Sequence, residues 1–356
     1  MVPQRRVDLK VVPGYGGGGA GPSGAEPGPR PPRRLFGRHA DPPAEVPGPL
    51  DSGLRPVDAL VLLYLAVTFC LMVALQAHLP VWALLGVAHA VAGVLLLRMA
   101  ATAPHPSPVL RWVRDFYPLL LLPVFYFEYH WLTQLTGVGP HDATVAAFEE
   151  RLFGYQPSQE LRRMWPWPWL SQYLHGAYFF YYLVPPMLAF TLYGTGRWRA
   201  FQESLTTVML SFFACGMVFL CYPVAGPYHH FGIPDLGPLG GGIAVLAHGI
   251  VQGGSSVGTA FPSSHAAVAV AVWMSALRLS PRVFRIQALI VPALVVGTVY
   301  GGFHYSVDAA AGVLFGVGAG VLGPKLHAFL ALRLPRTRAR PRVAAGSPLP
   351  KIGGGF

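Results

Sequence analysis

The sequence predicts an all-α polytopic transmembrane helix bundle of about eight spans, and three observations indicate this fold class. First, 53% of the 356 residues are hydrophobic and only 12% carry a charge, whereas soluble domains are about 25% charged. Second, several apolar runs reach about 20 residues, the length of a helix that crosses a bilayer. Third, Lys and Arg are distributed unevenly among the segments that connect these runs. An ordinary soluble enzyme is therefore excluded.

The two ends of the chain differ from its body. Residues 1–55 are rich in Gly, Pro and Arg, and residues 331–356 are basic and rich in Pro and Gly. Segments of this composition cannot bury a core, so we expect two disordered tails. The first tail has no compact apolar stretch before a small-residue cleavage site, which argues against a cleaved signal peptide. Cys70, Cys215 and Cys221 lie in apolar runs and indicate neither a disulfide framework nor a cysteine metal site.

Between the tails, the apolar runs predict the membrane spans in order. The expected spans are 57–78, 81–98, 117–136, 172–193, 203–223, 264–280, 284–302 and 306–326. Pro185 and Pro186 should kink the fourth span, which is tolerable where neighbouring helices satisfy the freed carbonyls. The glycines of the last span allow close packing against its neighbours. We expect the first three spans to form an N-terminal region, 56–136, and the others a membrane core, 137–330.

The basic residues predict the orientation of the spans. If the N-terminus is cytoplasmic, 23 of the 26 Lys and Arg residues lie in cytoplasmic segments, and only Arg151, Arg162 and Arg163 do not. This asymmetry follows the positive-inside rule, so the net charge of +11 reflects topology and requires no nucleic-acid partner. The Ala, Gly, Pro and Arg usage is typical of a GC-rich genome. We expect a multi-pass protein of the bacterial plasma (inner) membrane with both termini cytoplasmic; in a eukaryote, the outer face would be a secretory lumen.

Two long segments lie on the predicted outer side. Segment 137–171 contains a predicted surface helix, 142–163, followed by three tryptophans. The apolar stripe of this helix comprises Val145, Phe148 and Leu152. The helix either lies on the membrane with an aromatic anchor or packs over the mouth of the bundle. Segment 224–263 is rich in Gly, and a loop of this length is often functional.

The polar residues near the spans predict the site. Ionisable groups inside spans are costly, which makes Glu128, Asp308, His265 and His304 candidates. His265 follows Pro262-Ser263-Ser264, and the serines suit a helix start whose free N–H groups can bind an anion. His304 and Asp308 are four residues apart and share one helical face. An Asp that accepts the imidazole Nδ1–H leaves Nε2 free to act as nucleophile or base.

Taken together, the two motifs resemble those of the type 2 phosphatidic acid phosphatase superfamily, which comprises membrane lipid phosphatases and phosphotransferases with a six-helix core. Residues 262–265, Pro-Ser-Ser-His, are similar to the family's Pro-Ser-Gly-His, with Ser in the Gly position. His304 and Asp308 are similar to its last motif, His-x-x-x-Asp. The resemblance covers about residues 140–326. The Lys and Arg count independently places both motifs at the outer membrane face.

The resemblance implies a double displacement on a membrane lipid. His304 would attack phosphorus and form a phosphohistidine, Asp308 would orient it, and His265 would protonate the departing oxygen. An acceptor hydroxyl or water would then attack the phosphoenzyme. The residues assigned to substrate binding are Ser263, Ser264 and Tyr305. The resemblance implies no cofactor, no metal and no obligatory protein partner, although three histidines and an acid could in principle bind zinc.

Two departures from the phosphatase pattern concern basic residues. Gly297 and Thr298 stand where the family has a Ser-Arg pair, and its first motif, with Lys and Arg-Pro, has no counterpart beside Tyr228. A phosphomonoester dianion needs such arginine forks more than a phosphodiester does. The His-Tyr-x-x-Asp form and the segment DATVAAFEERLFGYQP resemble the branch of inositol phosphorylceramide synthases and sphingomyelin synthases. This branch moves a phospho-headgroup from a glycerophospholipid to another lipid alcohol.

Several alternatives stay open. The chain could be a lipid phosphate phosphatase that hydrolyses phosphatidic acid or a prenyl diphosphate, or a catalytically inactive lipid-binding relative. His229 and His230 could replace the missing positive charge or be ordinary loop residues, and His248 is taken as a loop residue. Glu128 is either a buried anchor or a headgroup contact. A transporter is disfavoured because the polar groups cluster at one face, and an intramembrane protease because Asp308 is the only deep Asp.

Overall fold

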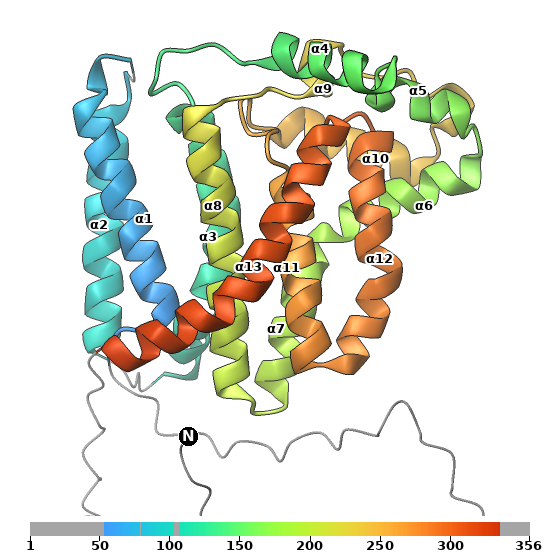
Figure 1. Cartoon of the computed structure of the whole chain (residues 1–356). Coiled ribbons are helices and arrows are strands. Elements are labelled where there is room, and N and C mark those ends of the chain that lie inside the picture. The colour runs from blue at the N-terminus through green and yellow to red at the C-terminus, as the bar shows by residue number, and fades with distance from the viewer. Residues whose placement is uncertain (1–52, 79, 103–106, 335–356) are drawn as a thin grey trace, which may run out of the picture. The chain divides into compact units, whose positions relative to one another are not determined.

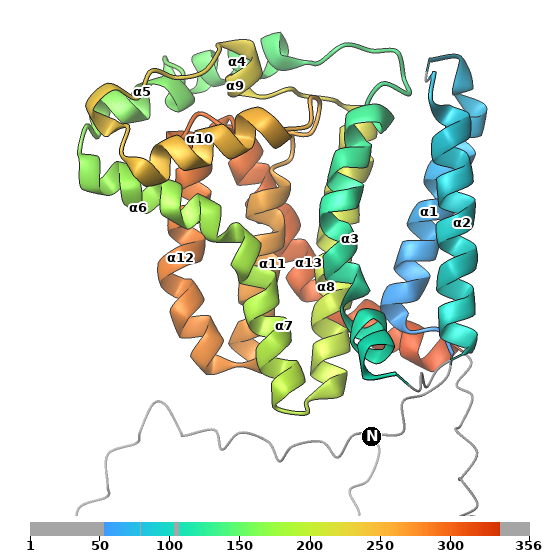
Figure 2. The same cartoon turned by 180° about the vertical axis from the view of Figure 1, so that it is seen from behind.

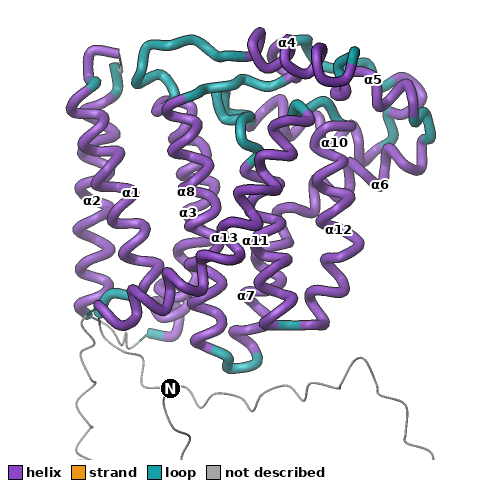
Figure 3. The backbone as a smooth tube through the Cα atoms, viewed as in Figure 1, coloured by secondary structure: helices purple, strands orange, loops and turns teal. Residues whose placement is uncertain are grey.

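The computed structural model describes residues 53–78, 80–102 and 107–334. All regular elements within these residues are helices (Figures 1 and 3), and one isolated bridge pairs Val224 with Thr259. The α-helices are α1 (Pro56–Ala74), α2 (Trp82–Ala101), α3 (Pro108–Leu132), α4 (Asp142–Phe153), α5 (Pro157–Met164), α6 (Pro168–Phe179), α7 (Val184–Gly194), α8 (Trp198–Cys221), α9 (Pro227–His230), α10 (Gly242–Gly254), α11 (Ser264–Leu279), α12 (Pro281–Tyr300) and α13 (Ser306–Arg333). Of the two predicted tails, the structure describes only residues 53–55 and 331–334; the rest lies outside the described residues.

The helices have the character of membrane spans. In the described part of the chain, five helices are long and apolar enough to cross a bilayer: α1, α2, α8, α12 and α13. Their outer faces carry large apolar side chains, and Leu84, Leu289 and Leu314 are 71%, 72% and 72% exposed. Such surfaces suit acyl chains rather than water. The predicted fold class, an all-α polytopic bundle, is confirmed, and the chain is a membrane protein.

A buried charge network joins the start of α1 to α3. The carboxylate of Asp58 accepts hydrogen bonds from Arg114 Nη1 (2.7 Å) and from the Tyr117 hydroxyl (2.6 Å). Beside it, Arg55 forms an ion pair with Asp115 at 2.8 Å. Buried charges are tolerated when they are paired and hydrogen-bonded, so this network holds α1 and α3 in one register. Arg55 therefore belongs to the folded bundle and not to the predicted tail.

Close helix packing at α13 brings the two halves of the site together. α13 runs obliquely across α8 and α11 and contacts both (Figure 1). A β-carbon added at Gly312 or Gly316 would clash with the carbonyl oxygen of Ser263 or Ala267 in the α11 segment. The absence of side chains at these positions lets the two backbones approach. The close packing predicted for the last span is therefore confirmed.

Two predicted helices are broken in the structure. The expected span 172–193 consists of α6, a 3₁₀ turn at Phe180–Leu183, and α7. Pro185 and Pro186 lie in the first turn of α7, where a missing N–H costs little, so they mark a new helix rather than a kink. The expected surface helix 142–163 is likewise two helices, because Gly154 ends α4 in the left-handed region with φ of 76°. The Gly-rich segment 224–263 contains α9 and α10, which the sequence did not predict.

The helix ends define two ends of the bundle. The end of α2, the α7–α8 turn and the α11–α12 turn lie at one end, and these segments carry the basic residues predicted to be cytoplasmic (Figures 1 and 2). At the other end, α4, α5, α9 and α10 lie across the bundle, a group of helices called the cap below. The start of α11 and the α12–α13 junction also lie at the cap end. Both predicted motifs are therefore at the same end of the bundle.

Candidate functional site at the cap end of the bundle

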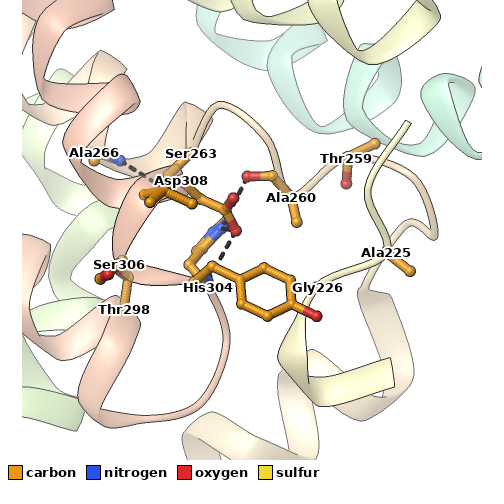
Figure 4. A network of polar contacts seen from close by, with 12 residues as sticks. Ala225, Gly226, Thr259, Ala260, Ser263, Ala266, Thr298, His304, Ser306 and Asp308 are labelled. Atoms are coloured by element: carbon orange, nitrogen blue, oxygen red, sulfur yellow. Dashed lines mark hydrogen bonds and ion pairs between the residues drawn. The ribbon is translucent and has the colours of Figure 1, made fainter. Parts of the chain in front are cut away.

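His304 lies in the short loop 301–305 between α12 and α13. Its Nδ1 is 3.0 Å from the carbonyl oxygen of Ala260 and 3.6 Å from Asp308 Oδ2 (Figure 4). A carbonyl can only accept a hydrogen bond, so Nδ1 carries the proton and donates it to Ala260. The sequence predicted that Asp308 would accept this proton; the structure gives that role to Ala260, with the carboxylate beside the ring. Either arrangement leaves Nε2 without a proton and free to act as a nucleophile.

The environment of His304 keeps the imidazole neutral. The residue is 6% exposed, and burial lowers the pKa of the imidazole to about 4, although the hydrogen bond to Ala260 opposes the shift. Burial acts in this direction because a low dielectric disfavours the charged form. The ring is therefore uncharged near neutral pH, which a nitrogen nucleophile requires.

Local hydrogen bonds explain the position of the His304 loop. The backbone N–H groups of Phe303 and His304 both donate to the Thr298 carbonyl at 3.0 Å, which closes the end of α12. Gly302 adopts φ of 73°, a conformation that favours glycine. At the start of α13, Asp308 Oδ2 accepts from the Tyr305 backbone N–H at 2.9 Å. Asp308 thus caps its own helix and faces His304 with the same oxygen.

His265 lies opposite His304. Their ring centroids are 5.9 Å apart, and His265 Nδ1 has no hydrogen-bond partner among the described residues. The rings of Tyr181, Tyr178 and Tyr126 surround His265, with centroids 4.4, 5.2 and 6.2 Å away. The structure therefore brings the three predicted residues His265, His304 and Asp308 together.

The three predicted substrate-binding residues have different positions. The Ser263 hydroxyl oxygen accepts from the Ala266 backbone N–H at 3.3 Å and caps α11. Ser264 lines a cavity beside His265. Tyr305 is fully buried, and its hydroxyl donates to Asp142 Oδ1 at 3.2 Å. This hydroxyl is already engaged inside the protein, so Tyr305 supports the His304 loop in this structure rather than facing a substrate.

Asp142 is a site residue that the sequence analysis did not identify. Its Oδ2 accepts from the Ala225 backbone N–H at 2.8 Å, and its Oδ1 accepts from Gly226 N–H at 2.7 Å. The same segment is joined to the His304 acceptor, because Ala260 N–H donates to the Val224 carbonyl at 2.8 Å. Asp142 thus fixes the strand-like segment that holds Ala260 in place. Charge-assisted bonds of this kind are about twice as strong as neutral ones.

Glu149 provides a second contact from α4 to the site region, at the start of α13. Its Oε1 accepts from the Val307 backbone N–H at 3.1 Å and from the Ser306 hydroxyl. A carboxylate at a helix N-terminus is favourable, here at the start of α13. Asp142, Val145, Ala146 and Glu149 are buried on one face of α4, whereas Phe148 and Leu152 of the predicted stripe are 55% and 58% exposed. Of the two expected placements, α4 packs over the mouth of the bundle.

Two basic side chains near the site come from the cap, Arg162 and His229. Arg162 of α5 is buried, and its Nη1 donates to the Tyr300 carbonyl at 2.8 Å, beneath the His304 loop. His229 Nε2 is 3.0 Å from the Ser255 hydroxyl. Burial lowers the pKa of His229, and the nearby carboxylate of Asp142 opposes this shift. In the sequence, Arg162 stands out only as one of the three basic residues in outer segments, and this position was the available signal.

An apolar cavity of about 250 Å³ leads to His265. At the site, its wall is formed by Ser264, His265 and three tyrosines, and further away by side chains of α3, α7 and α10. Two lining side chains, Phe127 and Tyr182, are 57% and 50% exposed, so the cavity reaches the lateral surface of the bundle. A lipid chain can therefore reach the site from the side. In the described part of the chain, no group of three or more His, Cys, Asp or Glu residues could hold a metal ion.

Comparison with known proteins identifies a family. The model of the PAP2 superfamily matches residues 144–322, a range that includes His265, His304, Asp308 and Glu149. No curated protein and no solved structure matches the chain. Helices α1 to α3 and Asp142 lie outside the matched range.

Proposed function

Because the chain belongs to the PAP2 superfamily, we propose that it is an integral membrane phosphotransferase that moves a phospho-headgroup from one lipid to the hydroxyl of another. Membership in this superfamily supports a lipid phosphatase or phosphotransferase type of function. The observation that carries the proposal is the apolar cavity that ends at His265 and Ser264. A lipid in this cavity would present its phosphoester at His265, whose ring centroid is 5.9 Å from that of His304, while its chains stay in an apolar environment.

In the first step, His304 Nε2 attacks phosphorus, and the bond between phosphorus and the leaving lipid oxygen breaks. The bound anionic phosphoester favours the protonated form of His265, which gives its proton to that oxygen. The phosphorylated imidazole keeps its Nδ1–H and becomes positively charged. The Asp308 carboxylate, 3.6 Å from Nδ1, and the Ala260 carbonyl, 3.0 Å away, stabilise this charge. Asp308 therefore acts mainly on the phosphoenzyme, where the charge develops.

In the second step, the acceptor hydroxyl attacks phosphorus and gives its proton to His265. The bond between phosphorus and Nε2 breaks, and both histidines return to their initial states. Free backbone N–H groups at the start of α11 and the hydroxyls of Ser263 and Ser264 would hold the non-bridging oxygens. A phosphodiester carries one negative charge, which this neutral donor set with Arg162 nearby suits better than a dianion.

The dryness of the site favours transfer over hydrolysis. Asp308 is fully buried, His304 is 6% exposed, and tyrosine rings surround His265. A site that excludes water favours attack by a lipid hydroxyl. The resemblance to inositol phosphorylceramide synthases supports the same choice.

We also propose the location of the reaction. The basic segments at the end opposite the cap favour the cytoplasm, so the cap and the site would lie at the extracytoplasmic face of the plasma (inner) membrane. Accessibility of a cysteine introduced on the cap to a membrane-impermeant maleimide in intact cells tests this orientation.

The experiment for the reaction uses purified full-length protein and three labelled donors: phosphatidic acid, a prenyl diphosphate, and phosphatidylinositol with ceramide or diacylglycerol as acceptor. With phosphatidylinositol and ceramide we expect a new labelled phospholipid and a trapped phosphoenzyme, whereas transfer to diacylglycerol forms phosphatidylinositol again. His304→Ala should lower both by about 10³-fold or more. The matched control is His78→Ala, since His78 is exposed in the turn between α1 and α2.

Three results would contradict the proposal. Release of free phosphate from phosphatidic acid or the prenyl diphosphate, without a new lipid, would make the protein a phosphatase. Product formation by folded His304→Ala would exclude the phosphohistidine. No phosphoenzyme with any donor, in folded protein, would favour an inactive lipid-binding relative.

A further inference from the structure

A second cavity, of about 490 Å³, lies between α1, α2 and α3. It belongs to the N-terminal helices, which lie outside the range matched by the family model. Phe127 of α3 lines both cavities, so they lie on either side of this helix. The reaction proposed above does not use the second cavity.

The wall of this cavity contains one ion pair. His89 Nε2 of α2 is 2.8 Å from Glu128 Oε1 of α3, and the two side chains are 4% and 10% exposed. The Tyr64 hydroxyl donates to Glu128 Oε2 at 3.3 Å. The other lining side chains are apolar, apart from Tyr117 and Trp131. Ionisable groups inside membrane helices are costly and mark functional sites, and an apolar cavity with a few convergent polar groups is typical of a ligand site.

The ion pair lies toward one end of the cavity. On α2, the lining continues from His89 through Ala92 and Leu96 to Met99, which is about 15 Å of helix at 1.5 Å per residue. This stretch of the α2 wall is wholly apolar. His89 lies in the first half of α2, where Leu85 and Ala88 also line the cavity, and Glu128 lies near the end of α3. The start of α2 and the end of α3 lie at the cap end of the bundle (Figure 2). The cavity thus has a polar end toward the same side as His304 and a long apolar part, which is the polarity of a lipid.

We propose that this cavity binds a neutral lipid alcohol, with its hydroxyl on the His89–Glu128 pair and its chain along α2 and α3. The pair carries no net charge, so it provides no net attraction for an anionic phosphate headgroup or for a cationic ammonium headgroup. A ligand hydroxyl can donate to the Glu128 carboxylate, whereas both ring nitrogens of His89 are already engaged, Nδ1 with the Leu85 carbonyl at 2.8 Å and Nε2 with Glu128. An ionised carboxylate has about four acceptor positions, so Glu128 can bind a hydroxyl while it keeps Tyr64 and His89.

Photo-crosslinking of the full-length protein in lipid bilayers tests this site. The probes are a diacylglycerol with a diazirine in one acyl chain, the same lipid with its hydroxyl acetylated, and a diazirine phosphatidic acid. Mass spectrometry of labelled peptides locates the crosslinks. We expect the diacylglycerol to label α1, α2 and α3 about tenfold more than either other probe, since one lost hydrogen bond to a charged group costs about that factor.

Matched variants distinguish specific binding in this cavity from nonspecific labelling of the lipid-facing surface. Ala92→Trp fills the cavity and should reduce diacylglycerol labelling about tenfold. Ala90→Trp, on the exposed face of the same helix, should not. Ala88→Trp is a second filling variant if Ala92→Trp does not fold. Equal labelling by the acetylated probe, or labelling unchanged in a folded filling variant, would overturn the proposal and leave His89 and Glu128 as a structural pair between two helices.

Discussion

The Tyr305 hydroxyl donates a hydrogen bond to Asp142 Oδ1 at 3.2 Å, and this bond joins the residue after His304 to the first residue of α4. The same carboxylate accepts from the backbone of Ala225 and Gly226. The cap therefore contacts the candidate nucleophile from two sides, through the α13 start and through the segment that carries the His304 acceptor. The sequence indicates α4 only as a surface helix, but in the structure its first residue, Asp142, holds the segments on both sides of His304 in place.

Asp142→Asn tests this support. An amide can retain one acceptor but cannot accept all three hydrogen bonds, so we expect turnover to fall by about 10- to 100-fold with little change in KM. The free energy of unfolding should fall by about 1–3 kcal/mol. Glu150→Gln, on the exposed face of the same helix, is the matched control. Turnover unchanged in Asp142→Asn would show that the His304 loop keeps its geometry without the cap.

Phosphoenzyme formation should persist to a lower pH than expected for an ordinary histidine nucleophile. Burial lowers the pKa of His304 to about 4, whereas an unperturbed imidazole titrates near about 6.5. The nucleophile is therefore neutral through the usual imidazole range, and the acid limb of the pH profile should lie near pH 4. Rapid-quench trapping of the phosphoenzyme measures this limb. Half-loss near pH 6.5 would show that His304 is protonated like a solvent-exposed histidine.

The free energy of unfolding should also fall as the pH is lowered. Burial lowers the pKa of His248 on α10 to about 4, and the nearby His175 and Arg162 add to the shift. As the pH falls, His248 in the unfolded chain takes up a proton at about pH 6.5, whereas in the folded protein it does so only near pH 4. The contribution of neutral His248 is therefore complete above that pH and is lost as pH falls toward 4. We expect a lower melting temperature at acid pH and a weaker dependence in His248→Gln. An unchanged slope in the variant would contradict this assignment.

Filling the first cavity should hinder long lipids selectively. Leu122 lines the cavity that leads to His265, whereas Leu120 is 50% exposed on the same helix and does not line it. Leu122→Trp should reduce kcat/KM for a long-chain donor about tenfold, with a smaller effect on a short-chain soluble analogue. Leu120→Trp is the control. Equal losses with both donors would indicate distortion of the site rather than loss of chain binding.

The sequence predicts the bundle well because the relevant signals are local. Apolar runs locate α1, α2, α8, α11 and α12 within about five residues, whereas α3 starts at Pro108 rather than 117 and α13 ends at Arg333 rather than 326. Pro-Ser-Ser-His and His-x-x-x-Asp locate the three candidate residues that the fold brings together. The pattern failed where apolar content continues through a change of direction, as between α6 and α7. It also failed at α10, because glycines at both ends of this helix resemble a loop.

The contacts that support the site were harder to predict. The acceptor for His304 is a backbone carbonyl, that of Ala260, and a carbonyl carries no residue-specific signal. Asp142 reaches partners that are more than 80 residues away along the chain. Its spacing of seven from Glu149 places both acids on the buried face of α4, which in retrospect was the available signal.

The glycines of α13 have a consequence for the chemistry. His265 is carried by α11, and His304 immediately precedes α13, so the separation of their rings depends on how closely these two helices approach. At Gly312 and Gly316, a single methyl group would force the helices apart. The distance between the two imidazole rings thus depends on the absence of side chains at Gly312 and Gly316, which are several residues away from either histidine. A chain could retain every residue of both motifs and still hold its two imidazoles too far apart to act on one phosphorus.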